Sequence, residues 1–391
     1  MRKEQEKDFD NEFKELIEMK SYLLSIVVPT KDRYPYLKRL IELVKSFDSD
    51  EVELVIQDNS DDNKEIVSFI NSLQYEHLKY FYKKGQLSVS ENADRAILNS
   101  TGEYVCFIGD DDGVIPEIID VIKYLKEKGA EAILANNPTY NWPDYFDDKS
   151  KSRIFYSQPS GTVKVLNTKQ ELEKVVKGGF RGLGGMPKVY HGIVKRSVLD
   201  KLYNKLRTFS PGGSPDMATA VSLSLIIDKI YYVNLPLIIN GQSIHVGGGE
   251  RALKGKLPKI EEVSFLPKSI VQDWNPKIPD IWCSDTIWPQ SAIYALSSMG
   301  YDGVKSIDYD NLLAFFFVSH GRYYKQYKHL ISNTMRVHLL ILYRKVRSIA
   351  RKIKIRLTKT DGRLVECNIT TINDASKLMS DIIKPFSFPK I

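Results

Sequence analysis

Residues 104–116 read Tyr-Val-Cys-Phe-Ile-Gly-Asp-Asp-Asp-Gly-Val-Ile-Pro, and this stretch decides the fold. Its apolar first part has the length and composition of a buried strand, and Gly113 marks the turn that follows. Asp110, Asp111 and Asp112 therefore lie at the carboxyl end of a strand, where open α/β sheets bind ligands. Adjacent buried carboxylates repel one another, and a hard cation such as Mg²⁺ or Mn²⁺ relieves that repulsion. The alternative is a solvated acidic turn, which would not need the aromatic and β-branched run before it.

The chain before and into this stretch alternates strand and helix patterns. Strand patterns are short apolar runs, whereas helix patterns carry apolar residues three or four positions apart. Strands are expected at 23–28, 51–57, 78–82 and 104–108, and helices at 36–47, 64–73 and 88–99. This alternation predicts βαβ units and an α/β fold, with a mostly parallel, Rossmann-like sheet flanked by helices.

Beyond residue 125 the pattern is less regular. Strands are expected at 132–135, 189–195 and 231–239 and a helix at 216–227, with an irregular stretch at 137–161 and glycine-rich loops at 178–187 and 241–249. We predict an amino-terminal helix over 1–22, a main domain over 23–255 with halves 23–125 and 126–255, and a helical, basic extension over 256–391.

The composition fits a folded protein, with 42% hydrophobic and 11% aromatic residues among 391. Cys106, Cys283 and Cys367 lie far apart without a CxxC pair, which argues against a zinc ribbon or a disulfide framework and suits a reducing cytosol. Residues 1–20 carry dense charge of both signs, unlike a secretory signal. The longest apolar run, 312–318, is too short to span a bilayer, which needs about 20 residues.

Polar groups follow three of the predicted strands. Pro29, Thr30, Asp32 and Arg33 follow the first strand, the turn 57–60 follows the second, and the acidic triplet follows the fourth. The carboxyl ends of parallel strands share one sheet edge, so these groups are expected to form a nucleotide pocket. Neither a P-loop nor a Gly-x-Gly-x-x-Gly motif follows the first strand, which argues against a P-loop or dinucleotide site.

These motifs resemble the nucleotide-sugar half of family 2 glycosyltransferases, which have the GT-A fold. The resemblance rests on Ser25–Arg33, Asp58-Asn59-Ser60, Glu91-Asn92-Ala93 and the stretch from Thr101 to Asp112. It covers residues 23–125, continues more weakly toward residue 250, and does not include 255–391.

The resemblance implies a donor site for a nucleoside-diphosphate sugar. Thr30 would lie against the nucleotide, and Asp58 would hydrogen-bond the base, usually uracil. Asn92 and Arg95 would line the diphosphate or the adjacent helix start. The Asp-x-Asp element of the family falls on the acidic triplet, where one carboxylate binds ribose and another binds the Mn²⁺ or Mg²⁺ that bridges the diphosphate.

The resemblance leaves the metal ligand open between two carboxylates. The commoner family pattern has Asp, a small residue and two further Asp. If this chain is aligned with the family pattern on Pro116, Asp111 is the metal ligand. If it is aligned on the Asp-x-Asp element, Asp112 is the ligand, and this assignment is favoured here, with Asp110 as a second ligand. His245 is a further candidate for the metal or the diphosphate, because related GT-A enzymes often supply a late histidine; the alternative is a structural histidine.

The resemblance also implies a catalytic base. Inverting enzymes of the family deprotonate the acceptor hydroxyl for an in-line displacement at the anomeric carbon. Asp216, which follows Pro215 at a helix start, stands where the family places that base, although the family often has Glu-Asp there. The alternative is a helix N-cap. His191 is a candidate for the acceptor pocket, as are Arg181 and Lys188 beside the glycine-rich loop, with a half-buried histidine and solvated charges as alternatives.

The net charge of +7 is unevenly distributed, because residues 322–360 contain many Lys and Arg and no Asp or Glu. Interleaved apolar residues over 322–356 predict a basic amphipathic helix or helix pair. Such a helix can bind an anionic membrane surface. Packing on the main domain and a homo-oligomer contact are alternatives, and nucleic acid is the least favoured partner.

The sequence therefore predicts an inverting, metal-dependent hexosyl- or N-acetylhexosaminyltransferase. It would move a sugar from a nucleoside-diphosphate sugar, with a UDP-sugar favoured, to a glycan or lipid-linked acceptor in cell-surface polysaccharide synthesis. A cytoplasmic protein that is peripheral on the inner face of the plasma membrane is expected. One alternative is a sugar-phosphate nucleotidyltransferase, which usually has a glycine-rich loop after the first strand. Another is a non-catalytic membrane- or partner-binding protein on a decayed transferase fold, against which the intact acidic motifs argue.

Overall fold

The computed structural model describes residues 22–85, 87–244, 257–263, 266, 268–301, 307–358 and 362–386. His245 and, apart from Tyr22, the predicted helix over 1–22 lie outside the described residues.

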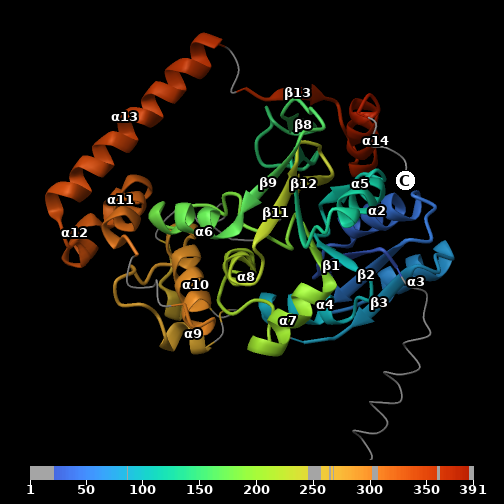
Figure 1. Cartoon of the computed structure of the whole chain (residues 1–391), viewed down its shortest axis with the longest axis horizontal. Helices are drawn as coiled ribbons and strands as arrows, with labels where there is room; N and C mark the ends of the chain where they lie inside the picture. The colour runs from blue at the N-terminus through green and yellow to red at the C-terminus, as the bar shows by residue number, and fades with distance from the viewer. Residues whose placement is uncertain are drawn as a thin grey trace, which may run out of the picture.

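An eight-stranded sheet in the order β3-β2-β1-β4-β10-β6-β11-β9 forms the centre of the protein (Figure 1). Its amino-terminal half contains the parallel strands β1 (Leu24–Thr30), β2 (Val52–Asp58), β3 (Leu78–Tyr82) and β4 (Tyr104–Phe107). Helices α2 (Tyr34–Lys45), α3 (Lys64–Leu73) and α4 (Val89–Leu98) connect them. The predicted α/β fold with a mostly parallel sheet flanked by helices is confirmed.

Helices cover both faces of this sheet because its strands are apolar on both sides. Alternate residues of a strand point to opposite faces. Ile26 of β1 is fully buried in a core with α2, whereas its neighbour Val27 is fully buried in a second core with α4. This two-sided burial explains why the strand sequences are continuous apolar runs rather than alternating ones.

The second half of the sheet mixes strand directions. It contains β6 (Ala132–Ala135), β9 (Val163–Asn167), β10 (Ile193–Lys195) and β11 (Lys229–Val233), with β10 antiparallel to β4 and β6, and β9 antiparallel to β11. Helices α5 (Ile118–Glu127), α6 (Thr168–Lys177), α7 (Arg196–Leu206) and α8 (Pro215–Ser224) belong to this part of the chain. The strand expected at 189–195 is shorter than predicted because His191 adopts a left-handed conformation with φ of 56°.

The strand expected at 231–239 is in fact two strands in different sheets. The chain leaves the large sheet after β11, passes Pro236, and enters a five-stranded sheet as β12 (Ile238–Gln242). This second sheet has the order β13-β8-β7-β12-β5 and contains β5 (Gly113–Val114), β7 (Thr139–Asn141), β8 (Arg153–Tyr156) and β13 (Leu364–Cys367). The stretch 137–161, expected to be irregular, supplies β7 and β8. The acidic triplet lies between β4 and β5, where the chain passes from one sheet to the other.

A buried carboxylate links the amino ends of strands β1, β2 and β4. Glu53 of β2 is fully buried, and its pKa is lowered, because the bonds from Lys79, Ser25 and the Thr101 amide outweigh the burial that would raise it. The Gly102 amide also donates to it over 3.1 Å. A Cβ on Gly102 would lie 2.6 Å from the Ser25 Oγ, so this position requires glycine. The Thr-Gly pair before β4 therefore has a structural role.

The carboxyl-terminal region is helical, as predicted, but its last part returns to the main domain. It contains η2 (Ile260–Glu262), α9 (Lys268–Gln272), α10 (Ser284–Ser298), α11 (Tyr309–Ser319), η4 (Gly321–Tyr323), α12 (Tyr324–Tyr327), η5 (Lys328–Leu330), α13 (Thr334–Thr358) and α14 (Ile372–Ile383). Strand β13 pairs with β8, and α14 packs on α2 and β5, where Ile372 and Met379 are fully buried (Figure 1). None of the described helices is long and apolar enough to cross a membrane.

The docking of α14 on α2 and β5 predicts a stability effect. Met379→Ala should lower the free energy of unfolding by about 2–5 kcal/mol, because it leaves a cavity in the main core. Urea unfolding followed by circular dichroism measures this. The exposed Lys377 on the same helix provides the control, since Lys377→Ala should change the stability little. Equal stability of the two variants would show that α14 is not part of the core.

Candidate active site

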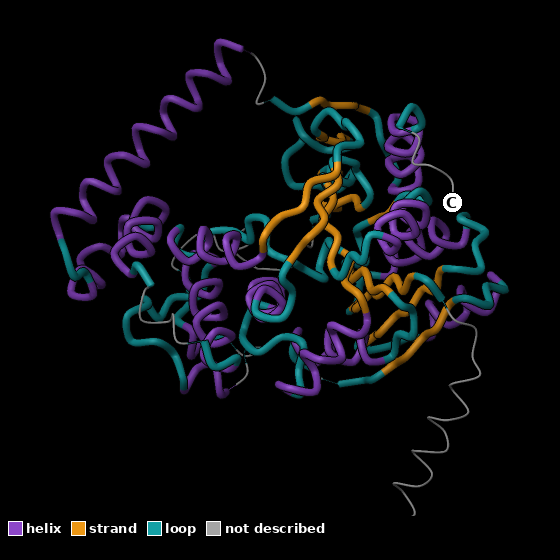
Figure 2. The backbone as a smooth tube through the Cα atoms, viewed as in Figure 1, coloured by secondary structure: helices purple, strands orange, loops and turns teal. Residues whose placement is uncertain are grey.

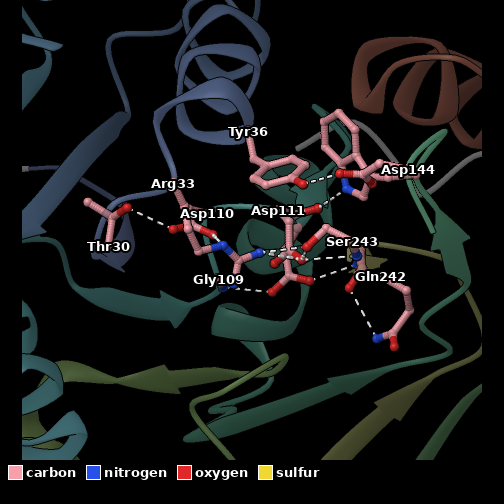
Figure 3. Close-up of polar contacts among 12 residues, drawn as sticks. Thr30, Arg33, Tyr36, Gly109, Asp110, Asp111, Asp144, Gln242 and Ser243 are labelled. Carbon is pink, nitrogen blue, oxygen red and sulfur yellow. Dashed lines mark hydrogen bonds and ion pairs between the residues drawn. The ribbon is translucent and has the colours of Figure 1, made fainter. Parts of the chain in front are cut away.

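The acidic triplet is buried at the junction of the two sheets (Figure 3). Asp110, Asp111 and Asp112 are 3%, 6% and 1% exposed. Burial raises the pKa of Asp110 and of Asp111, and the neighbouring carboxylates raise both further. Ionised carboxylates at these positions therefore require a nearby positive charge.

Arg33, directly after β1, supplies positive charge to two of the three carboxylates. Its Nε lies 3.0 Å from the Asp110 Oδ1, and its Nη2 lies 2.6 Å from the Asp111 Oδ2. Burial lowers the pKa of Arg33, but the two carboxylates outweigh that effect and leave the pKa raised. The Ser243 hydroxyl accepts from Arg33 over 2.8 Å and donates to Asp111 over 2.7 Å, which completes this set.

Asp112 is bonded differently from its two neighbours. The amides of Gly109 and Gly241 donate to its two oxygens over 2.6 Å and 2.8 Å, and the His191 Nε2 lies 2.5 Å from the Oδ2. A Cβ on Gly241 would lie 1.7 Å from the Asp111 carbonyl oxygen, so only glycine fits there. Hydrogen bonds from other parts of the protein thus already use both oxygens of Asp112, and these bonds hold β12 and His191 in place.

Asp112, which the resemblance favours as a metal ligand, already bonds Gly109, Gly241 and His191, whereas a divalent cation could replace the Arg33 guanidinium at Asp110 and Asp111. Both are oxygen donors of the kind that Mg²⁺ and Mn²⁺ prefer, and the only cation bonded to them in the described part of the chain is the Arg33 guanidinium. The choice between the two alignments, and so between Asp111 and Asp112 as the ligand, stays a prediction. His245 lies outside the described residues, so its assignment stays a prediction.

The register of β1 and β2 places Thr30 directly opposite Asp58 at the sheet edge. The Thr30 hydroxyl donates to the Asp110 Oδ2 over 2.7 Å, which links Pro29-Thr30 to the acidic triplet. Asp58 is fully buried and accepts from the hydroxyls of Tyr34 and Tyr80 over 2.8 Å and 2.6 Å. Both hydroxyls bond the Oδ2, and the Oδ1 accepts from the Ser60 amide over 2.8 Å. The role of Asp58 in base binding stays a prediction.

The three other predicted donor residues lie in the first loop and on α4, where Arg95 is in the last turn of the helix. Asp32 has a left-handed backbone with φ of 55°, and its carboxylate accepts from the Asp61 amide over 3.1 Å, which ties the first loop to the second. Asn92 of α4 is buried, and its Oδ1 has no hydrogen-bond partner, so an acceptor remains available there. Arg95, on the same helix, is exposed.

Asp216 lies in the first turn of α8. The N-cap of α8 is Ser214, so the structure does not support the alternative that Asp216 caps the helix. Burial raises the pKa of Asp216, while His191 and Lys188 oppose that rise. Asp216 is therefore electrostatically coupled to His191, which bonds Asp112. A carboxylate with a raised pKa suits a general base.

The other acceptor candidates divide between two places. Burial lowers the pKa of Lys188, which lines a surface pocket with Lys164, Glu171 and Tyr232, and the Asp216 carboxylate opposes that lowering. Arg181 is exposed and lies over the ring of Phe315, 4.7 Å from its centroid. The structure thus places Lys188 near the candidate base and gives Arg181 a contact with the carboxyl-terminal helices.

Sequence reasoning missed four residues that complete the site. The Arg33 guanidinium lies over the ring of Tyr36, whose hydroxyl bonds Asp144, and the Trp142 indole donates to the Asp111 carbonyl over 2.8 Å. Ser243 is the fourth. Trp142 and Asp144 come from the stretch expected to be irregular and carried no motif, whereas the glycine-rich run beginning at 241 was a usable signal.

Comparisons with known proteins agree with the motifs. Residues 25–183 match the family model described as Glycosyl transferase family 2. Over 119 residues the chain is 27% identical to a GalNAc(5)-diNAcBac-PP-undecaprenol beta-1,3-glucosyltransferase of Campylobacter jejuni, a match that covers 29% of this chain and 37% of that protein.

Two solved structures show weaker likenesses. S. aureus TarS 1-349 in complex with UDP-GlcNAc is 15% identical with a TM-score of 0.46, covering 81% of this chain and 86% of that one. The mannosyltransferase PcManGT of Pyrobaculum calidifontis, in complex with GDP-Man and Mn2+, is 12% identical with a TM-score of 0.40, covering 82% and 85%. TM-scores this low support no inference about this chain.

The position of Arg33 predicts competition with a divalent cation. Arg33→Gln should tighten the binding of Mn²⁺ alone by about fivefold or more, because it removes a cation from the same carboxylates. The same variant should weaken the binding of UDP, since it removes a charge from the predicted donor site. Titration of free Mn²⁺ by electron paramagnetic resonance measures the first effect. Lys31→Gln, which removes an exposed neighbouring charge, is the control; unchanged Mn²⁺ affinity in Arg33→Gln would rule out competition.

Asp94 of α4 predicts a pH effect on stability. Burial raises its pKa to about 6, although Thr208 and the Phe209 amide donate to it. Because the pKa is higher in the folded state, the stabilising contribution is present at low pH and is lost as pH rises through about 6. Asp94→Asn should therefore gain stability relative to the wild type as pH rises from about 4 to about 7. Thermal unfolding at several pH values measures this, and Asp120→Asn should show no such trend.

Proposed function

We propose that this chain, whose residues 25–183 belong to glycosyl transferase family 2, is an inverting, metal-dependent glycosyltransferase that uses a nucleoside-diphosphate sugar. The observation that carries the proposal is the buried acidic triplet at the carboxyl edge of the sheet, with His191 bonded to Asp112 and electrostatically coupled to Asp216. This arrangement would provide a cation site and a carboxylate base in one place. The chain spans about 37% of the length of the Campylobacter relative, so activity, substrates and partners remain proposals.

The donor would lie along the edge formed by the ends of β1, β2 and β4. Asp110 and Asp111 would hold the Mn²⁺ or Mg²⁺, which offsets the charge that develops on the leaving diphosphate. Thr30 orients Asp110 through its hydrogen bond, and Arg33 would turn from the carboxylates to the diphosphate oxygens. A UDP-sugar is the proposed donor, because the resemblance assigns Asp58 to a uracil base.

The acceptor hydroxyl would be deprotonated by Asp216. Burial keeps the pKa of this carboxylate raised, so it is a stronger base than an exposed aspartate. Asp112 accepts the bond of His191 and so fixes the imidazole, which is electrostatically coupled to Asp216. Lys188, on the same side, would attract an anionic acceptor such as a phosphorylated lipid.

The proposed acceptor is a glycan or a lipid-linked glycan in cell-surface polysaccharide synthesis. The Campylobacter relative is named for a PP-undecaprenol-linked acceptor, which supports this choice. Such an acceptor would place the protein peripherally on the inner face of the plasma membrane. A hexosyl or N-acetylhexosaminyl group is the proposed cargo. A nucleotidyltransferase is disfavoured because the loop after β1 lacks glycine.

Asp216→Asn tests the catalytic base. Transfer to an acceptor should fall by at least about a hundredfold, the contribution of a positioned general base, while the affinity for UDP stays the same. In the wild type the rate should fall as pH is lowered through the raised pKa of Asp216, because the base must be ionised. If the Asp216→Asn variant had the same turnover as the wild type, Asp216 would not be the catalytic base.

Calorimetric titration with UDP, with Mn²⁺ and then with EDTA, tests the donor site. Binding should require the metal, and Asp111→Asn should weaken it by at least about tenfold. If the predicted ligand Asp112 holds the metal instead, Asp112→Asn would be the more severe variant without loss of stability. Failure of UDP, GDP, CMP and dTDP alike to bind would favour the non-catalytic alternative.

A further inference from the structure

Helix α13 extends from the body of the protein (Figures 1 and 2). Its first half packs on α11, where Val337 is fully buried and Leu340 and Ile341 are partly buried. From Lys345 to Lys354 every residue of the helix is exposed. One face of α13 is therefore anchored near its start, and the rest of the helix lies in solvent.

An unbroken apolar stripe runs along the opposite, outward face of α13. Its members recur every three or four residues, the spacing that aligns side chains on one side of a helix. They are Met335, Leu339, Leu342, Val346, Ile349, Ile353 and Leu357, and each is between 54% and 78% exposed. We call this set the outward stripe. Large aliphatic side chains rarely form such a continuous exposed row on a monomer, and a row of this kind marks an interaction surface.

The charges beside the outward stripe have a single sign. Lys345, Arg347, Arg351, Lys352, Lys354 and Arg356 are the charged residues of this half, and residues 322–360 contain no Asp or Glu. A helix with an apolar stripe between basic flanks lies in the plane of a membrane interface, with the stripe in the acyl region and the flanks at the headgroups.

We propose that the outward stripe of α13 docks the protein on an anionic phospholipid bilayer. The stripe supplies the apolar area, and the basic flanks select negatively charged headgroups. This proposal narrows the predicted basic stretch 322–356 to one face of one helix, because the face that carries Val337 and Leu340 is already packed on α11. It does not depend on the transferase activity proposed above.

Charge makes a second copy of the chain a poorer partner for the same stripe. Two α13 helices packed stripe to stripe would bring two sets of basic flanks together, and neither helix has an acidic residue to offset them. Coiled-coil contacts normally place opposite charges beside the apolar seam. An anionic surface instead complements every flanking residue.

Flotation of the full chain with vesicles tests the proposal. Binding is expected to vesicles of phosphatidylglycerol and phosphatidylcholine, and not to phosphatidylcholine alone. The double variant Ile349→Glu with Ile353→Glu should lower the partition coefficient more than about tenfold, because two apolar side chains no longer enter the membrane. Lys352→Gln should lower it about fivefold, and added salt should weaken wild-type binding.

Ser348, which is exposed on the opposite face of the same helix, provides the matched control. Ser348→Glu adds one negative charge without touching the stripe, so it should lower binding no more than Lys352→Gln does. Thermal unfolding and UDP titration check that each variant is folded. Equal binding to charged and to neutral vesicles would overturn the proposal. Unchanged binding of the double glutamate variant would also overturn it. A third contradicting result would be a wild-type dimer in light scattering together with a monomeric double variant, because the stripe would then be a contact between two copies of the chain.

Discussion

The burial of three neighbouring carboxylates at the end of β4 is the constraint on which the site depends. Carboxylates removed from water ionise only where donors or cations replace the lost hydration. The chain meets this requirement from distant segments. Arg33 comes from the end of β1, the Gly241 amide from β12, and His191 from the loop before β10. The two sheets are therefore held together at the point where the acidic residues pass between them.

Two sets of buried carboxylates in this protein differ in how well hydrogen-bond donors and cations compensate for their lost hydration. Glu53 receives donors from Ser25, Thr101, Gly102 and Lys79, and its pKa is lowered. It is a stable structural anchor. Asp110 and Asp111 share the Arg33 side chain and accept further bonds from Thr30 and Ser243, but the pKa of each is still raised. A group that is incompletely satisfied in the free protein gains most when a cation binds, which is why the triplet and not Glu53 is the place to look for chemistry.

The carboxyl-terminal helices show two outcomes for amphipathic sequences of the same chain. The apolar face of α14 is buried against α2 and β5, where Met379 has no exposed surface. The outward stripe of α13 stays at least 54% exposed, although its spacing is just as regular. The periodicity of an amphipathic helix specifies that one face seeks an apolar environment, but it does not specify whether protein or lipid provides it.

By itself the sequence determined the alternating α/β half, the metal-type motif at 110–112, and the place of Asp216 at a helix start. These features depend on residues close together in the chain, where apolar periodicity and turn residues act locally. The expected ends of the first four strands and three helices lie within two residues of those observed.

Only the tertiary structure decided how differently the three carboxylates are bonded. Asp112 looks equivalent to Asp111 in the sequence, but folding places the Gly241 amide and His191 on Asp112 alone. The break of the strand at 231–239 into two sheets, and the return of α14 to the main core, were likewise decided by packing. Contacts between segments far apart in the chain depend on how whole elements dock, and no local pattern encodes that arrangement.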